Sequence, residues 1–294
     1  MKKKLLLSLL SLTALLVLSA CGSSGTKTTT KIVAGGSTAL QPLVTQGAQE
    51  FMTENPEVSI TVQPGGSGAG LTSVSNGSFQ IGNSDIFAEE KSGIDASKLK
   101  DHQVAVVGVA PIVNSEITKK VKLLTQEELI DIFSGKITNW KKVGGPDEEI
   151  TIIGRTEGSG TRALFDRYGL NKGTELASAA TQDSTGAAAK AVASTPGSIS
   201  YVSFAGAVLE GVSKMPIQFI GEESATQAID KNVMDNSWKI WGYEHMYTAA
   251  DPDETTVAFI DYVKSNKTNL HGLGFISTED MKGERTVDGT WTEK

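Results

Sequence analysis

Three short segments rich in glycine and serine have the composition of anion-binding loops. They read GGSTA over residues 35–39, GGSGAG over 65–70 and RTEGSGTR over 155–162. Each follows an apolar, strand-like run and precedes a helical pattern, so its backbone N–H groups lie at a helix start and lack intrahelical partners. These groups and the helix dipole favour negative charge. Alone, each segment also fits an ordinary helix cap, but together they predict a site for one small tetrahedral oxyanion.

The third of these segments adds a fixed positive charge. Arg155 ends a strand-like run and can form a bidentate pair with an oxyanion. Ser159 and Thr161 offer hydroxyl donors, and Gly160 lets the backbone approach a ligand closely. Glu157 is predicted to hold Arg155 in place by an ion pair. The alternative is a surface Arg–Glu pair beside a capped helix, which contributes little.

A carboxylate follows another strand-like run, in the sequence GNSD that ends at Asp85. Beside an anion a carboxylate is repulsive, unless the ligand carries a proton for it to accept. Monohydrogen phosphate has such an O–H group at neutral pH, whereas sulfate does not. A site built around this hydrogen bond can reject a ligand that lacks it by about 10⁴–10⁵-fold. Asp85 therefore favours phosphate, unless it is an ordinary helix-capping or turn aspartate.

Composition narrows the functional classes. The 294 residues are 39% hydrophobic and 21% charged, which suits a folded chain of about two domains. The net charge of −7 argues against a nucleic-acid binder, which needs a basic field. A single cysteine excludes an intramolecular disulfide and a Cys-cluster metal site, and the three histidines are far apart in sequence. We predict no metal and no cofactor.

An alternation of strand-like and helical patterns must position the three segments. Strands are predicted at residues 31–35, 58–62, 79–83, 104–113, 151–154 and 199–204. Helices are predicted at residues 42–54, 71–76, 161–168, 184–193 and 254–265, with another after a capping box at 125–128. This order indicates an α/β protein, in which ligands bind where loops leave the carboxyl ends of the strands.

The first residues have the pattern of an export signal. Lys2-Lys3-Lys4 precede an apolar run over 5–18 that is too short to cross a bilayer comfortably. Cys21 follows in the sequence LSACG, which resembles the lipobox of bacterial lipoproteins, where this cysteine carries lipid such as palmitate. We predict a signal peptide at 1–20 and a lipid-anchored, flexible tether at 21–30. Loss of the signal peptide, with its three lysines, takes the net charge from −7 to −10. We predict that the mature protein lies on the extracytoplasmic face of the cell membrane.

The motifs GGSTALQP, GGSGAG, GNSD and RTEGSGTR, in this order, resemble the phosphate-binding proteins of bacterial phosphate ABC importers. The resemblance runs from Lys31 to about Thr278 and includes similar stretches at 129–140 and 196–201. It implies a two-lobed fold of the periplasmic-binding-protein type, with a hinge and a ligand cleft between the lobes. The implied lobe I covers 31–109 plus 244–294, and the implied lobe II covers 110–243.

The same resemblance implies a function and a set of contacts. The protein would bind inorganic phosphate outside the membrane and deliver it to the permease subunits of an importer with a cytoplasmic ATPase. It would be no enzyme and would have no nucleic-acid partner. Glu157 stands where better-known members have aspartate, and Ala39 where they have an aromatic residue. The implied phosphate contacts are Ser37, Thr38, Ala39, Ser67, Asp85, Arg155, Ser159, Gly160 and Thr161, with Glu157 in support.

Other classes stay open at this point. A secreted phosphatase or other hydrolase would use Ser67 or Ser159 as nucleophile, although no histidine is near either in sequence. A receptor for sulfate, molybdate or an organic anion would share the fold, although Asp85 disfavours fully deprotonated oxyanions. A structural or adhesive lipoprotein would leave the three segments without a role. Turnover of a phosphomonoester separates the hydrolase from a receptor.

Overall fold

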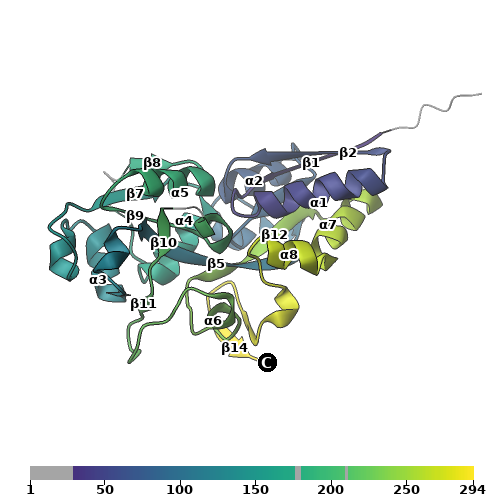
Figure 1. Cartoon of the computed structure of the whole chain (residues 1–294). Helices are drawn as coiled ribbons and strands as arrows, with labels where there is room; N and C mark the ends of the chain where they lie inside the picture. Colours follow the sequence, from purple (N-terminus) through teal and green to yellow (C-terminus); the bar gives the residue numbers. More distant parts are fainter. Residues whose placement is uncertain (1–28, 176–179, 209–210) are drawn as a thin grey trace, which may run out of the picture.

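The computed structural model describes residues 29–175, 180–208 and 211–294 (Figure 1). The predicted signal peptide, Cys21 and the tether as far as residue 28 lie outside the described residues. Across the described ranges, no helix combines the length and the apolar character needed to cross a membrane.

The first half of the molecule is built on three parallel strands. In chain order its elements are β1 (Thr30–Gly36), α1 (Gln41–Glu54), β2 (Val58–Pro64), α2 (Ser67–Ser75) and β3 (Ile81–Ser84). Strand β1 lies between β2 and β3 and runs parallel to both. Pro42 lies in the first turn of α1, where its missing N–H group costs no hydrogen bond. Because the strands are parallel, the loops that follow them open at one edge of the sheet.

The second half repeats this plan. Its elements are α3 (Gln126–Phe133), β7 (Thr151–Arg155), α4 (Gly160–Leu164), one stretch of π-helix (Phe165–Gly169), β8 (Ala180–Gln182), α5 (Thr185–Ser194) and β9 (Ser198–Ser203). Strand β7 runs parallel to β8 and β9. Thr125 and Glu128 form the predicted capping box of α3. The loop after β7 therefore opens at the carboxyl edge of these strands, as the loops of the first half do.

Two long strands join the halves. Strand β5 (Gln103–Asn114) pairs with β12 (Trp241–Ala249) over residues 103–108 and with β9 over residues 109–113. Strand β12 also pairs with β3, in antiparallel orientation. The described strands therefore form a ten-stranded sheet in the order β2-β1-β3-β12-β5-β9-β7-β8, with β10 (Val212–Lys214) beside β5 and β4 (Leu99–Lys100) beside β12.

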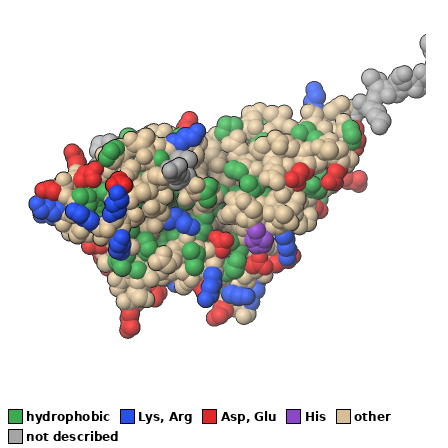
Figure 2. All heavy atoms as spheres, in the orientation of Figure 1, with side chains coloured by type: hydrophobic (Ala, Val, Ile, Leu, Met, Phe, Trp, Pro, Cys, Tyr) green, Lys and Arg blue, Asp and Glu red, His purple; other side chains and the backbone are tan. Residues whose placement is uncertain are grey.

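The remaining elements cover the sheet and extend the chain. Helix α7 packs against α1, with α8 beside it, as Figure 1 shows. Their bounds, and those of the smaller elements, are β6 (Leu124–Thr125), β11 (Ile217–Gln218), α6 (Asp230–Met234), α7 (Glu254–Ser265), α8 (Lys267–Gly272), β13 (Gly283–Arg285) and β14 (Trp291–Glu293). On the face drawn in Figure 2, both basic and acidic side chains are scattered over the surface.

The predicted α/β class is confirmed, and most predicted elements lie within a few residues of the observed ones. Two local predictions are wrong. The GGSGAG segment is not a loop as far as Gly70, because α2 begins at Ser67. The predicted helix over 161–168 divides into α4 and the π-helical stretch. The first difference matters for the site, because it makes Ser67 the first residue of a helix.

Candidate anion-binding site

The three predicted segments and Asp85 meet where the two halves face each other. The first two segments and Asp85 follow β1, β2 and β3, and the third follows β7. Thr161 Oγ1 donates a hydrogen bond to Asp85 Oδ2 at 3.0 Å. Arg155 Nη2 donates one to Thr38 Oγ1 at 3.2 Å. Each of these bonds joins one half to the other, so the predicted residues of the two halves form one cluster.

Arg155 is the positive group of this cluster, and its side chain is only 1% exposed. Its guanidinium donates to Thr38 Oγ1, to Thr185 Oγ1 and to the carbonyl oxygen of Gln182, at 3.2–3.3 Å. Burial lowers the pKa of Arg155, and the nearby Asp85 carboxylate opposes that shift. Among the described residues the guanidinium of Arg155 bonds only to neutral oxygens, so it has no direct ion-pair partner and can pair with an anion.

The predicted support from Glu157 is wrong. Glu157 is exposed, and in the described structure it makes no ion pair with Arg155. The chain turns at Gly158, whose φ of +85° suits glycine, and Glu157 is left on the surface while Ser159 enters the cluster. The carboxylate of Glu157 and the guanidinium of Arg155 are therefore not paired, although the two residues are only two positions apart.

A different carboxylate supports the arginine segment. Glu175 is 6% exposed and accepts hydrogen bonds from Tyr201 at 2.8 Å and from Arg162 Nη1 at 2.9 Å. Arg162 Nη1 also donates to the carbonyl oxygen of Arg155, and Tyr201 accepts from the Arg155 N–H group. This cluster therefore fixes the backbone of Arg155 through both its N–H group and its carbonyl oxygen. Sequence spacing carried no signal for it, because Glu175 and Tyr201 both lie outside the segment 155–162.

Asp85 is 2% exposed, and it does not cap the following 3₁₀ helix, which starts at Ala88 after Phe87. Its N–H group donates to Ser67 Oγ at 2.9 Å, and its Oδ2 accepts from Thr161. Its Oδ1 is buried and has no hydrogen-bond partner among the described residues. A buried carboxylate with an open acceptor site suits a ligand that brings its own proton.

The serine hydroxyls are arranged as neutral donors. Ser37 Oγ accepts from the N–H groups of Ala39 and Leu40, and Ser67 Oγ accepts from Asp85. Ser159 Oγ accepts from the N–H group of Arg162 at the start of α4. Because each oxygen accepts from the backbone, its own hydrogen can be donated to a ligand. Ala39 itself is buried, with 1% exposure.

The hydrolase alternative finds no support in these contacts. The described histidines lie elsewhere: His245 contacts Asp101, His102 contacts Thr248, and His271 lies near Asp280. Ser67 and Ser159 each accept from a backbone N–H group and contact no histidine in the part of the chain that the structure describes. A serine nucleophile needs an adjacent base.

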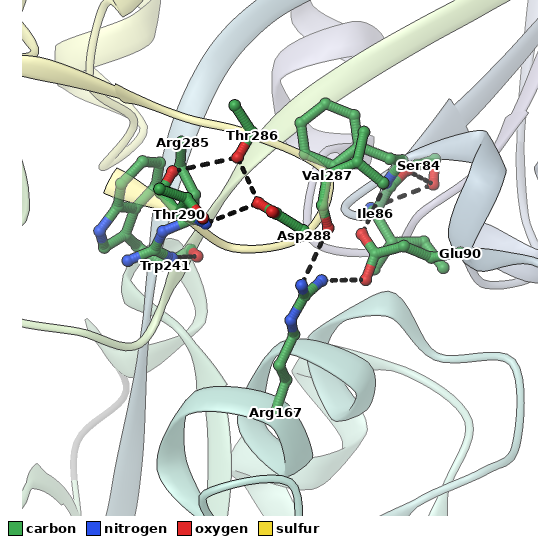
Figure 3. A network of polar contacts seen from close by, with 11 residues as sticks. Ser84, Ile86, Glu90, Arg167, Trp241, Arg285, Thr286, Val287, Asp288 and Thr290 are labelled. Atoms are coloured by element: carbon green, nitrogen blue, oxygen red, sulfur yellow. Dashed lines mark hydrogen bonds and ion pairs between the residues drawn. The ribbon is translucent and has the colours of Figure 1, made fainter. Parts of the chain in front are cut away.

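A second set of contacts joins the halves beside the β13–β14 hairpin (Figure 3). Arg167 Nη1 forms an ion pair with Glu90 Oε2 at 2.7 Å, and its Nη2 donates to the Val287 carbonyl oxygen at 2.9 Å. Nearby, the Arg285 guanidinium lies 3.7 Å from the centre of the Trp241 ring and 4.2 Å from that of Tyr168. The two halves are therefore in contact both at the candidate site and beside this hairpin.

Asp166 gives a prediction for stability. Burial raises its pKa to about 6, which Arg162 opposes and Glu175 reinforces. A carboxyl group with a folded-state pKa above its unfolded value lowers stability when both states are ionised, and this penalty disappears as pH falls below the unfolded pKa. Asp166→Asn should therefore stabilise the protein by about 1–2 kcal/mol at pH 8 and by almost nothing near pH 4, measured by urea unfolding.

The matched control is Asp147→Asn, which changes a carboxylate that is 70% exposed. It should alter stability by less than about 0.5 kcal/mol at either pH. A stabilisation by Asp166→Asn that is equal at pH 8 and pH 4 would contradict the assignment.

Known proteins resemble this chain in sequence and in fold. Residues 22–267 match the family model of the PBP superfamily domain. The chain is 42% identical over 304 aligned residues to the phosphate-binding protein PstS of Bacillus subtilis (strain 168), with 98% of each chain covered. A candidate phosphate ABC transporter substrate-binding protein from Clostridium perfringens, solved with bound phosphate, superposes with a TM-score of 0.74 at 28% identity, covering 84% of this chain and 99% of that one. An ABC-type phosphate transport receptor from Vibrio cholerae superposes with a TM-score of 0.65 at 25% identity, covering 83% and 99%.

Proposed function

Because the chain belongs to the phosphate-binding proteins of the PBP superfamily, we propose that it binds inorganic phosphate and delivers it to an ABC importer. The observation that carries this proposal is a pair of buried groups on opposite sides of one cluster. Arg155 is a cation without a carboxylate partner among the described residues, and Asp85 is a carboxylate with an open acceptor oxygen. A monohydrogen phosphate ion supplies both missing partners at once.

The binding chemistry follows from these groups. The guanidinium of Arg155 faces the negative oxygens, and the hydroxyls of Ser37, Ser67 and Ser159 donate to them. Asp85 accepts the ligand's O–H group. Sulfate has no such proton, so its oxygens would face the Asp85 carboxylate without a hydrogen bond. Neutral donors and one arginine thus allow an acidic protein to bind an anion selectively.

We infer that phosphate binding is coupled to closure of the two lobes. We assign lobe I to residues 31–109 plus 244–294 and lobe II to residues 110–243, with β5 and β12 crossing between them. Asp85 and Ser67 come from lobe I, and Arg155 and Thr161 come from lobe II. Because the ligand contacts both lobes, its binding favours the closed arrangement.

The place and partners of the protein complete the proposal. Lipid on Cys21 would hold the chain at the extracytoplasmic face of the cell membrane. The closed, phosphate-loaded form would dock on permease subunits coupled to a cytoplasmic ATPase. Binding is the whole of its chemistry, and we assign it no catalytic step.

Titration calorimetry on the protein without residues 1–20 tests the proposal. Phosphate should bind with 1:1 stoichiometry, and sulfate should give no heat at the same concentrations. Incubation with a phosphomonoester should give no turnover above background. Failure to bind phosphate, or catalytic turnover, would overturn the proposal.

Gly160 provides a prediction about closure. A Cβ atom at Gly160 would collide with Ser67 Oγ and would lie 2.8 Å from Asp85 Cβ, and both of these residues are in the opposite half. Gly160→Ala should therefore hold the halves apart and weaken phosphate binding at least tenfold, measured by calorimetry, while the melting temperature changes little.

The control for this variant is Gly186→Ala, in the first turn of α5. A Cβ atom at Gly186 meets no atom within 4 Å. Gly186→Ala should leave the phosphate Kd within about twofold, since it adds a side chain in open space. Normal phosphate binding by Gly160→Ala would show that the halves do not approach each other this closely around the ligand.

A further inference from the structure

Glu244 is a fully buried acidic residue that the binding chemistry above does not use. It lies on β12 with 0% exposure. Neither of its carboxyl oxygens has a hydrogen-bond partner among the described residues, and the same holds for Asp85 Oδ1. An isolated buried carboxylate is strongly unfavourable, so this group needs either a partner or a proton.

The strand register places Glu244 beside Asp85. Strands β3 and β12 are antiparallel, with Ser84 opposite His245 and Asn83 opposite Met246. Continuing this register by one residue puts Asp85 opposite Glu244, and opposite residues have Cβ atoms about 4.5–5.5 Å apart on one face of the sheet. The register therefore makes the two buried side chains neighbours on one face of the sheet.

A single proton on one of the two carboxyl groups makes this buried pair favourable. Two carboxylates at this range have only acceptors facing each other, whereas a carboxylic acid can donate to a carboxylate. Burial, and after it the Asp85 carboxylate, raise the pKa of Glu244 well above its ordinary value. Asp85 already accepts from Thr161 and lies near Arg155. Glu244 is therefore the carboxyl group of this pair that holds a proton.

We propose that Glu244 is a positioning residue, which donates its O–H group to Asp85 and fixes that carboxylate in the orientation that accepts the ligand's proton. This inference rests on the proposed function, because it assigns Asp85 to phosphate. Each carboxylate oxygen offers two lone-pair sites, so bonds from Thr161 and Glu244 leave room for the ligand. Selectivity for a protonated anion then depends on two carboxyl groups rather than one.

Two variants separate positioning from packing. Glu244→Gln keeps a neutral donor of the same shape, and its phosphate Kd should stay within about threefold of the wild type. Glu244→Met keeps the volume and removes the donor, and its Kd should rise about 10- to 100-fold. The melting temperature of Glu244→Met should be at least that of the wild type, because a buried polar group is removed. Glu244→Leu replaces it if the Met variant is not recovered folded.

A double-mutant cycle with Asp85→Asn completes the test. In that background, Glu244→Met should change the phosphate Kd by less than about threefold, because the carboxylate that Glu244 orients is gone. An unchanged Kd for Glu244→Met alone, or equal losses for the Gln and Met variants, would overturn the inference while wild-type phosphate binding stands. Absence of phosphate binding by the wild type would instead overturn the proposed function.

Discussion

Replacing Arg155 by alanine is expected to weaken phosphate binding by about 2–5 kcal/mol, which raises the Kd from about 30-fold to several thousand-fold. Arg155 is buried and has no ion-pair partner among the described residues, so the ligand is what neutralises it. Removing the guanidinium leaves the phosphate charge facing neutral donors and the Asp85 carboxylate. Calorimetric titration with phosphate measures the change.

Lys91→Ala is the control for this prediction. Lys91 lines one pocket together with Glu157 and Gly158. It carries the same charge as Arg155, but its side chain is more exposed than the buried Arg155. Its loss should change the phosphate Kd less than about threefold, because solvent screens exposed charges. Equal effects of the two substitutions would show that general charge, and not the buried guanidinium, binds the anion. A near-wild-type Kd for Arg155→Ala would move the site elsewhere.

Asp85→Asn is expected to change selectivity more than any other substitution. Asparagine can donate to a fully deprotonated oxygen, so sulfate should begin to bind while phosphate loses its charged acceptor. The ratio of sulfate Kd to phosphate Kd should fall at least 100-fold, within the range that one obligatory hydrogen bond supplies. Parallel titrations with the two anions, at one pH and one salt concentration, give this ratio directly.

Glu157→Gln is the matched control for charge near the site. It removes an exposed carboxylate from the same loop as Ser159, so the selectivity ratio should stay within about twofold. Unchanged selectivity in Asp85→Asn would remove Asp85 from the mechanism, and with it the role assigned to Glu244.

Sequence patterns predicted the helices whose start or buried face depends on residues close together in the chain. The capping box at Thr125 and the apolar spacing of α7 depend on residues three or four positions apart, and both are found as expected. The convergence of the first two segments and Asp85 was also predictable, because the parallel strands β1, β2 and β3 open their loops at one edge. The third segment follows β7 in the other half, and only the pairing of β5 with β12 and β9 brings the two halves face to face.

Partners that are distant in sequence were not predictable. Strand β12 was missed because eight of its nine residues are buried, so it lacks the alternation that marks a half-exposed strand. Glu244 was missed with it, since only the pairing of β12 with β3 brings it to Asp85. Glu157 was predicted to support Arg155 because it is two residues away in sequence. The turn at Gly158 instead leaves Glu157 on the surface. Glu175, which is more distant in sequence, forms an ion pair with Arg162 of the same segment.

A crystal structure of the protein without residues 1–20, grown with phosphate, would show whether Arg155 and Asp85 bind the anion together. We expect one phosphate between the two halves, with the Arg155 guanidinium and the Asp85 carboxylate both at about 2.5–3.2 Å from its oxygens. A phosphate bound on another face, or one that contacts neither of these side chains, would contradict this expectation.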